Sequence, residues 1–463
     1  MVSGSIRWTG YVTTGASNRP MLNAGEFGSV LSRTAVSSLT YDGARMGDPS
    51  FLSRLAAGLT ARRLRIHGFI LAVCLWSSYA IDLAHPGLVD RFGLVKGTDF
   101  VHFYTLGTLA LQQRASQLYD SGAQTALSAQ LMPEVPARYY VALYGPQVSL
   151  FFAPFAKLPY GWALTLWWLF SATVYAGCCY AVWRTCPRLR GYGGTVLILA
   201  IAYPAFFHLI AWGQSSAPAL LCFTLAFLAL QSGKDFLAGL AIGLLAFKPP
   251  LALAAAVVFL LSREWKVVAG AVFSGGAQLL PAWVYYGFSA IRNYWSALQQ
   301  LRMVFPYLEP RPYQMHSLRT FWSLLIPWPA AAFAVYVLTG AVVLVLTTLI
   351  WRRRTALGLK FSALLFATVL VAPHLTVYDL VVLAPSFLLL ADWTLGHSAS
   401  SSSPPLRLLL YLAYTLPLIG PLAQWTHLQL SILCFSAVLY YLGKITMRPT
   451  TADFASSELS VQT

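Results

Sequence analysis

Acidic side chains are scarce in this chain. Only 15 Asp and Glu occur among 463 residues, against 31 Lys and Arg, and charged residues make up 10% of the composition. Soluble domains carry about 25% charged residues, so this shortage argues against a soluble globular protein. Apolar residues reach 57% and the mean hydropathy is +0.63. Such a balance is typical of a polytopic, all-α integral membrane protein.

Several motifs that carry chemistry are absent as well. The chain contains neither GxxxxGK(S/T) nor GxGxxG, which argues against nucleotide motors and dinucleotide enzymes. It lacks HExxH, a Cys/His cluster and a paired DxD motif. We therefore expect no cofactor, no obligatory metal and no metal-chelated nucleotide-sugar donor. The six cysteines show no CxxC spacing, so they are expected to be reduced thiols that pack as small hydrophobes.

The net charge of +16 raises the question of a nucleic-acid partner. Many of the basic residues stand in short loops between apolar runs, where they set the orientation of membrane helices. Arg62, Arg63 and Arg65, for example, precede the first apolar run. The charge therefore indicates an orientation with both termini inside, and we expect membrane lipids rather than a nucleic acid as surroundings.

Apolar runs of the length needed to cross a bilayer recur along the chain. They predict about 12 spans, and the exact number depends on how the two short runs on either side of "FKPP" are counted. The predicted spans cover about 67–85, 160–183, 194–212, 216–231, 236–247, 250–262, 267–287, 330–351, 359–375, 377–395, 406–425 and 427–443. We expect a flexible inside tail over 1–60, one membrane domain over 61–445 and a second inside tail over 446–463.

Two segments predicted to lie outside are too long to be turns. They cover about 86–158 and 288–328, and both mix aromatic residues with amphipathic stretches, such as "DFVHFYTLGTLALQQ". Helices of this kind can lie in the membrane interface. We expect these extracytoplasmic helices to form a lid over a membrane-facing cavity or a cap that binds a partner.

Polar residues recur at the same predicted outer level. Gln214 follows a tryptophan, His374 and Asp379 surround one short turn, and Lys248 precedes two prolines. Proline cannot continue the helical hydrogen-bond ladder, so "KPP" predicts a broken helix beside a cavity. A lysine there suits a phosphate, although a lysine that snorkels to the surface is the alternative.

Five motifs, taken in order, resemble the family-87 glycosyltransferases. They are "TDFVHFY", "YGPQVSLFFAPFAKLPY", "WGQSSAPALL", "GKDFLAGLAIGLLAFKPPLAL" with "HSLR", and "APHLTVYDLVVL", and they cover about 65–395. The family usually has "YPP" where this chain has Tyr144-Gly145-Pro146. The resemblance implies a bundle of the GT-C fold class and a polyprenol-phosphate-mannose-dependent mannosyltransferase type.

The resemblance also implies an inverting transfer from a polyprenyl-phosphate sugar on the extracytoplasmic face. Such a transfer needs a base for the acceptor hydroxyl and positive groups for the departing phosphate. Asp99 matches the catalytic Asp of the first outside loop. The alternatives are a solvated loop acid or an N-cap of the following helix, a position that either Thr98 or Asp99 suits.

The remaining candidates divide by charge. The donor phosphate is assigned to Lys248, Arg302, Arg311 and Arg319, with a lipid-headgroup face as the alternative for the arginines. Sugar or acceptor contacts are assigned to His102, Gln214, His316, His374 and Asp379. His102 fits a packed aromatic cluster equally well, and Asp379 fits a structural pair with Lys248 or an arginine.

The sequence leaves the sugar and the acceptor open. Mannose is the expectation from the family, a pentose is the alternative, and the acceptor is a glycolipid, a cell-wall glycan or a protein. A bacterial inner membrane with a periplasmic active site is the expected location. The rival class is a transporter or flippase of a lipid-linked sugar, since carriers also use broken helices.

Overall fold

The computed structural model describes residues 51–135, 140–141, 143–300, 311–398 and 400–447, and the side chains from residue 54 onward. Every regular element within these ranges is a helix, and the only pairings of strand type there are two isolated bridges, Val89 with Val95 and Met315 with Thr376. The prediction of an all-α polytopic membrane protein is therefore confirmed.

Seven helical segments in the described ranges are long and apolar enough to cross a membrane, or eight if one pair bent by 43° counts as a span. The straight segments are α2 (Ala61–Leu83), α6 (Tyr160–Arg184), α12 with α13 (Trp265–Ala277 and Leu280–Tyr286), α17 (Pro329–Arg352), η5 with α19 (Val377–Leu383 and Ala384–Gly396), α20 through η6 to α21 (Ser403–Thr415, Leu416–Leu422 and Ala423–Thr426) and α22 (Leu430–Met447). The bent pair is η2 with α7 (Pro187–Tyr192 and Gly193–Ile201) and α8 (Pro204–Trp212).

The other four predicted spans are helices too short to cross alone. They are α9 (Ser216–Gln231), α10 continued by η3 (Asp235–Gly243 and Leu244–Phe247), α11 (Pro249–Leu261) and α18 (Leu357–Val371). At about 1.5 Å per residue, a 13-residue helix reaches only about 20 Å, against about 30 Å of hydrocarbon. All twelve apolar runs are thus helical, while twelve full spans stay a prediction.

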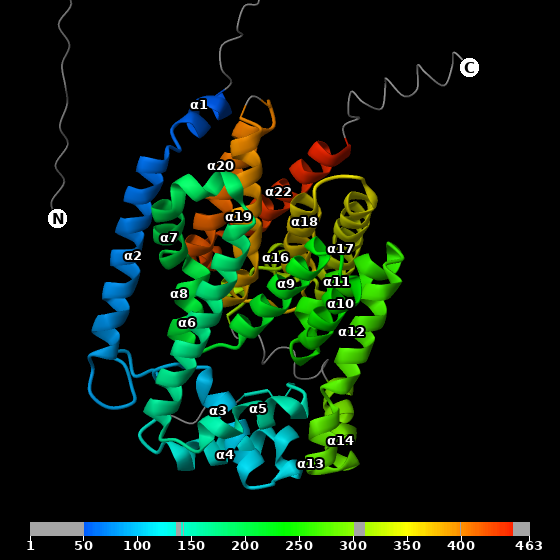
Figure 1. Cartoon of the computed structure of the whole chain (residues 1–463). Coiled ribbons are helices and arrows are strands. Elements are labelled where there is room, and N and C mark those ends of the chain that lie inside the picture. The colour runs from blue at the N-terminus through cyan, green and yellow to red at the C-terminus, as the bar shows by residue number, and fades with distance from the viewer. Residues whose placement is uncertain (1–50, 136–139, 142, 301–310, 399, 448–463) are drawn as a thin grey trace, which may run out of the picture. The chain divides into compact units, whose positions relative to one another are not determined.

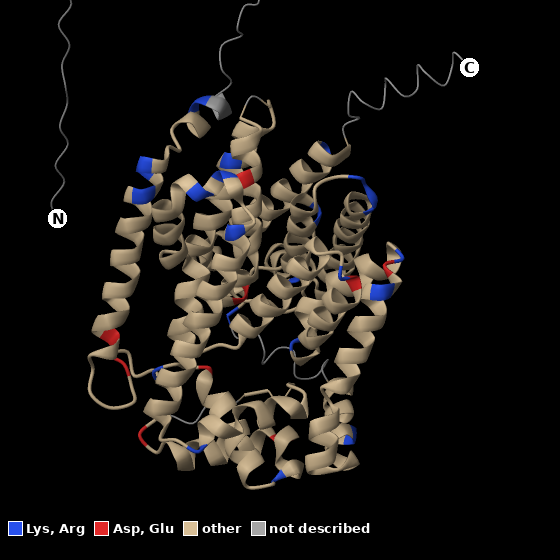
Figure 2. Ribbon diagram, in the orientation of Figure 1, with Lys and Arg blue, Asp and Glu red and all other residues tan. Residues whose placement is uncertain are grey.

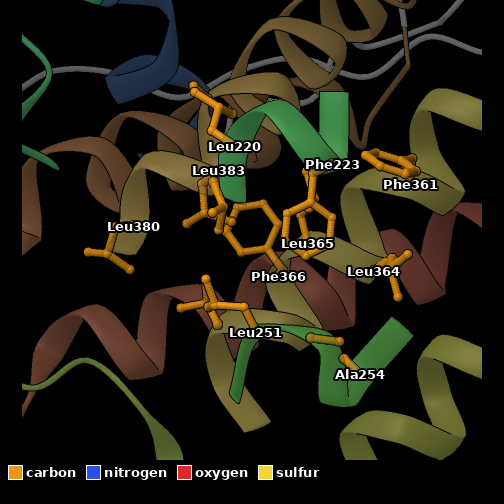
Figure 3. Packing of buried hydrophobic residues seen from close by; sticks show 14 of the residues in the cluster. Leu220, Phe223, Leu251, Ala254, Phe361, Leu364, Leu365, Phe366, Leu380 and Leu383 are labelled. Atoms are coloured by element: carbon orange, nitrogen blue, oxygen red, sulfur yellow. The ribbon is translucent and has the colours of Figure 1, made fainter. Parts of the chain in front are cut away.

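These short helices build the main core of the protein. Every side chain of α18 from Phe361 to Val371 is buried, and α9 and α11 pack around it together with η5. Figure 3 shows Phe223 of α9, Leu251 of α11 and Leu383 of η5 gathered around Leu365 and Phe366. Because protein rather than lipid surrounds α18, this helix does not need the length of a full span.

The two predicted outer segments are also helical (Figure 1). The first holds α3 (Phe100–Leu111), η1 (Ala115–Tyr119), α4 (Ser121–Leu131) and α5 (Pro146–Ala156), and the second holds α14 (Phe288–Gln299), η4 (Pro312–Gln314) and α16 (Leu318–Leu325). Arg302 and the rest of 301–310 lie outside the described residues. The two segments touch where the rings of Tyr119 and Tyr294 lie 5.8 Å apart.

Helix α3 corrects one expectation. We predicted an amphipathic helix in the membrane interface, but its side chains are buried on every face from Phe100 to Ala110. It packs on α5 closely enough that a β-carbon on Gly107 would lie 2.5 Å from the carbonyl oxygen of Phe152. The apolar residues of α3 therefore form a second core rather than a lipid-facing stripe.

Lys and Arg gather toward the end of the bundle where α2 begins and α22 ends (Figure 2). Residues 51–57 of the predicted tail form a short helix, α1 (Phe51–Ala57), and Thr60 caps α2 by accepting a hydrogen bond from the backbone of Arg63. Residues 1–50 and 448–463, which include the rest of both predicted tails, lie outside the described residues.

Candidate functional site

Asp99 occupies the N-cap position of α3, but its side chain makes no capping hydrogen bond. Its backbone N–H donates to the carbonyl of Trp212 at 2.9 Å, which ties α3 to the end of α8. The neighbouring backbone is fixed as well, because the hydroxyl of Tyr140 donates to the carbonyl of Thr98 (2.7 Å) and that of Tyr160 to the carbonyl of Lys96 (2.8 Å). The carboxylate is therefore presented by a fixed backbone and does not serve as the side-chain cap of α3.

Gln214 holds that carboxylate. Its Nε2 donates to Oδ2 of Asp99 at 2.7 Å, while its Oε1 accepts from the backbone N–H of Ser215 at 3.0 Å, so both ends of the amide are assigned. The turn that places Gln214 ends α8 in a Schellman arrangement, with Gly213 at φ +65°, a conformation that suits glycine. Two residues 115 positions apart in sequence are thus joined.

Lys248 lies in the break between η3 and α11 and forms a buried ion pair with Asp379 of η5. Its Nζ also donates to Oγ of Ser216 at 2.9 Å, and that hydroxyl donates to Oδ1 of Asp379 at 2.6 Å. The second oxygen of Asp379 accepts from the backbone N–H and the hydroxyl of Thr376, both at 3.2 Å, in a capping box. The structural pairing of Asp379, one of the two alternatives for this residue, is confirmed.

Aromatic residues connect the two acids. Nζ of Lys248 lies 5.2 Å from the ring centroid of Tyr378, and that ring lies 5.5 Å from the ring of Trp212. The phenol of Tyr144 interacts electrostatically with Lys248, Asp379 and Asp99. Burial raises the pKa of Tyr144, and the positive charge of Lys248 opposes that rise, so the phenol is a neutral hydrogen-bonding group at physiological pH.

His102 lies inside an aromatic cluster one turn beyond Asp99. Its ring stacks on Tyr140 with centroids 5.0 Å apart and lies 5.7 Å from that of Tyr144. Neither ring nitrogen has a hydrogen-bond partner among the described residues. Burial lowers the pKa of His102 to about 4, so the imidazole is neutral at physiological pH.

His316 lies apart from this cluster in its contacts. Its Nδ1 hydrogen-bonds to the hydroxyl of Ser431 on α22 at 2.8 Å, and burial lowers its pKa to about 3. Its backbone N–H donates to the carbonyl of Leu375, one residue before the Thr376 cap. His316 thereby supports the turn that carries Asp379 without a described contact to Asp99.

The remaining candidates, Arg311, Arg319 and His374, lie outside this cluster. Arg319 donates to the carbonyl of Pro373 at 3.4 Å, beside the partly exposed His374. Arg311 is exposed at the start of η4. The structure therefore brings Asp99, Gln214, Lys248 and Asp379 together, and it places Arg319 against the turn that precedes Asp379.

Sequence reasoning missed Tyr144, Ser216, Thr376 and Tyr378 as members of the cluster. All four lie inside motifs already singled out, "YGPQ", "WGQSS" and "TVYD". For Ser216, Thr376 and Tyr378 the available signal was a position within three residues of Gln214 or Asp379, and for Tyr144 it was the motif alone. Within the described residues no group of three or more His, Cys, Asp or Glu could hold a metal ion.

The cluster offers two different carboxylates. Both oxygens of Asp379 are occupied by Lys248, Ser216 and Thr376, and the residue is 1% exposed. Asp99 is partly exposed, and its Oδ2 accepts a hydrogen bond from the amide of Gln214. Of the two carboxylates, the partly exposed Asp99 is therefore the one that an acceptor hydroxyl can reach.

Comparisons with known proteins point to one family. The family model described as Glycosyltransferase family 87 matches residues 142–373, just over half of the chain. Gln214 and Lys248 fall inside the match, whereas Asp99 and Asp379 flank it. No curated protein and no solved structure matches.

Proposed function

The chain belongs to glycosyltransferase family 87, and from that membership we propose that it transfers a sugar from a polyprenyl-phosphate donor with inversion at the anomeric carbon. The proposed sugar is mannose, and the proposed acceptor is a glycolipid or cell-wall glycan. The proposed location is a bacterial inner membrane with the active site on the extracytoplasmic side. The family makes the chain a glycosyltransferase rather than a carrier, and the finer assignments are ours.

One observation carries the proposal: the partly exposed carboxylate of Asp99 and the buried ammonium of Lys248 both interact electrostatically with the phenol of Tyr144. In the proposed reaction, the acceptor oxygen forms a bond to the anomeric carbon while its proton passes to Asp99. The bond between that carbon and the phosphate oxygen breaks, and polyprenyl phosphate leaves with the electron pair. Gln214 orients the base through the 2.7 Å hydrogen bond, and such alignment is what general-base catalysis needs.

Lys248 is the proposed contact for the departing phosphate. Its ammonium has three N–H donors, and the described hydrogen bonds to Ser216 and Asp379 occupy two. A phosphate oxygen can take the third. We propose that Arg311 and Arg319 add positive charge for the phosphate. His102, His374 and Tyr144 are the proposed contacts of the sugars. Asp379 and His316 are proposed to act through the residues that they hold in place.

The test is transfer of labelled mannose from polyprenyl-phosphate mannose to endogenous acceptors in membranes that contain the full chain. Asp99→Asn removes the base but keeps an acceptor oxygen for Gln214. We expect turnover to fall roughly 100- to 10,000-fold, the range of general acid–base catalysis. Glu134→Gln, an exposed acid of the same outer segment, is the matched control and is expected to keep full activity.

The outcomes separate two kinds of failure. Equal turnover in Asp99→Asn and the intact chain would refute the assignment of the base. If the intact chain leaves the label on its donor, the sugar or the donor is wrong, and a labelled polyprenyl-phosphate pentose is the next substrate.

A further inference from the structure

A cavity of about 420 Å³ opens in the basic half of the bundle. Residues of α1, α2, α6, α7, α19 and α20 line it, and none of the proposed site residues does. Its walls are mainly aliphatic and aromatic, with the side chains of Tyr175, Tyr203 and Tyr414 among them. This volume lies in the range of small-ligand sites, and the lining suits a hydrocarbon chain rather than a sugar.

Arg407 of α20 gives the cavity a charge. Its Nε is buried and has no hydrogen-bond partner among the described residues, although a buried polar group without a partner is costly. The cavity lining contains no carboxylate. Arg62, Arg63 and Arg65 stand in the first turns of α2, next to the lining residues Thr60, Ala61 and Leu64. The surroundings are therefore strongly positive, and the missing partner of Arg407 should be an anion.

The wall between α2 and α20 faces outward. The rings of His67 and Tyr411 meet there, with Nδ1 of the histidine 3.1 Å from the hydroxyl of the tyrosine, and both residues are exposed in part or in full. Helix α2 exposes apolar side chains such as Phe69, Ile70 and Val73, whereas its Trp76 packs against α7 and donates to the carbonyl of Ile201.

We propose that the cavity binds one acyl chain of an anionic phospholipid, taken from the leaflet at the basic end of the bundle, and that the lipid phosphate pairs with Arg407. Charge complementarity supports this occupant, because basic pockets between membrane helices bind anionic headgroups. The guanidinium fork of Arg407 matches phosphate geometry. This proposal does not depend on the transferase assignment.

The experiment is a lipid titration of the delipidated full chain in detergent, with bound lipid counted by native mass spectrometry. We expect phosphatidylglycerol to bind in preference to phosphatidylcholine. Arg407→Gln should weaken phosphatidylglycerol binding about tenfold, the loss expected for one hydrogen bond to a charged group. Arg353→Gln removes an exposed arginine that does not line the cavity and should leave the affinity unchanged.

A second variant tests whether the cavity holds the acyl chain of the lipid. Ala391→Phe places a large side chain of α19 in the cavity and leaves Arg407 unchanged. We expect this variant to retain no bound phosphatidylglycerol. Equal binding of phosphatidylglycerol by Arg407→Gln and the intact chain would overturn the proposal, as would equal binding of the two phospholipids. Displacement of phosphatidylglycerol by a lower concentration of undecaprenyl phosphate would also overturn it, because the occupant would then be an isoprenoid lipid.

Discussion

The ion pair between Lys248 and Asp379 supports a quantitative test of the site's construction. Lys248 is 8% exposed and Asp379 1% exposed, so neither charge is hydrated if its partner is lost. Removal of one member of a buried pair costs about 3–5 kcal/mol of folding free energy. We therefore expect Lys248→Met and Asp379→Asn each to destabilise the protein by about that amount.

The double variant should not cost the sum of the two. Once the lysine is gone, the neutral amide at position 379 no longer leaves a buried charge unpaired, and it can still accept from Thr376. We expect the double variant to cost about as much as one single variant, which gives a coupling energy of roughly 3 kcal/mol between Lys248 and Asp379.

The assay is reversible unfolding in mixed micelles with increasing SDS, followed by circular dichroism. The pair formed by Arg188 and Asp392 is the control, because the arginine side chain is 49% exposed. Partly exposed pairs contribute about 0–1 kcal/mol, so the same cycle on that pair should give a much smaller coupling. A coupling at Lys248 no larger than the control would refute the view that the two charges depend on each other.

Three further changes probe the rest of the site. Gln214→Leu should lower turnover at least about tenfold with little loss of fold, since a hydrogen bond to a charged group is worth about 1.5–3 kcal/mol; unchanged kcat would exclude an orienting role. Gly213→Ala should destabilise the protein by about 1–3 kcal/mol, because the φ of Gly213 is +65° and the new β-carbon would lie 2.7 Å from the β-carbon of Phe100 on α3. Gly161→Ala, whose β-carbon would meet nothing within 4 Å, is the control in the same SDS titration. His102 is neutral when folded, with its pKa lowered to about 4, and regains an ordinary pKa of about 6.5 when unfolded. The unfolded chain therefore binds more protons between these values, stability falls as pH drops from about 6.5 to 4, and His102→Phe should flatten that part of the pH profile.

The sequence predicted the helices well because apolar runs and the proline and glycine breaks are local signals. The predicted run 216–231 coincides with α9, and the break at Lys248 separates η3 from α11. The number of full spans was not predictable, because length alone does not tell whether lipid or protein surrounds a helix. The burial of α18 depends on packing partners far away in sequence.

The site was predicted only in part for a related reason. Acids are scarce enough that Asp99 and Asp379 stand out in the sequence, and Asp379 is costly at the start of a membrane helix unless it is paired. What distinguishes the two is their partners, an amide for Asp99 and a lysine for Asp379, and these lie 115 and 131 residues away. His102 and His316 were chosen for their chemistry, whereas their burial, which makes both neutral, depends on aromatic rings and on α22.

The break at Lys248 also has a consequence for biogenesis. The lysine leaves the ribosome 131 residues ahead of the acid that neutralises it, a delay of roughly 7–26 s at about 5–20 residues per second. During that interval a charged lysine within the bilayer would lack its partner acid, which is unfavourable. We therefore expect the segment from α10 to α11 to wait near the membrane surface or within the insertion machinery. It reaches its final depth only when η5 arrives with Asp379.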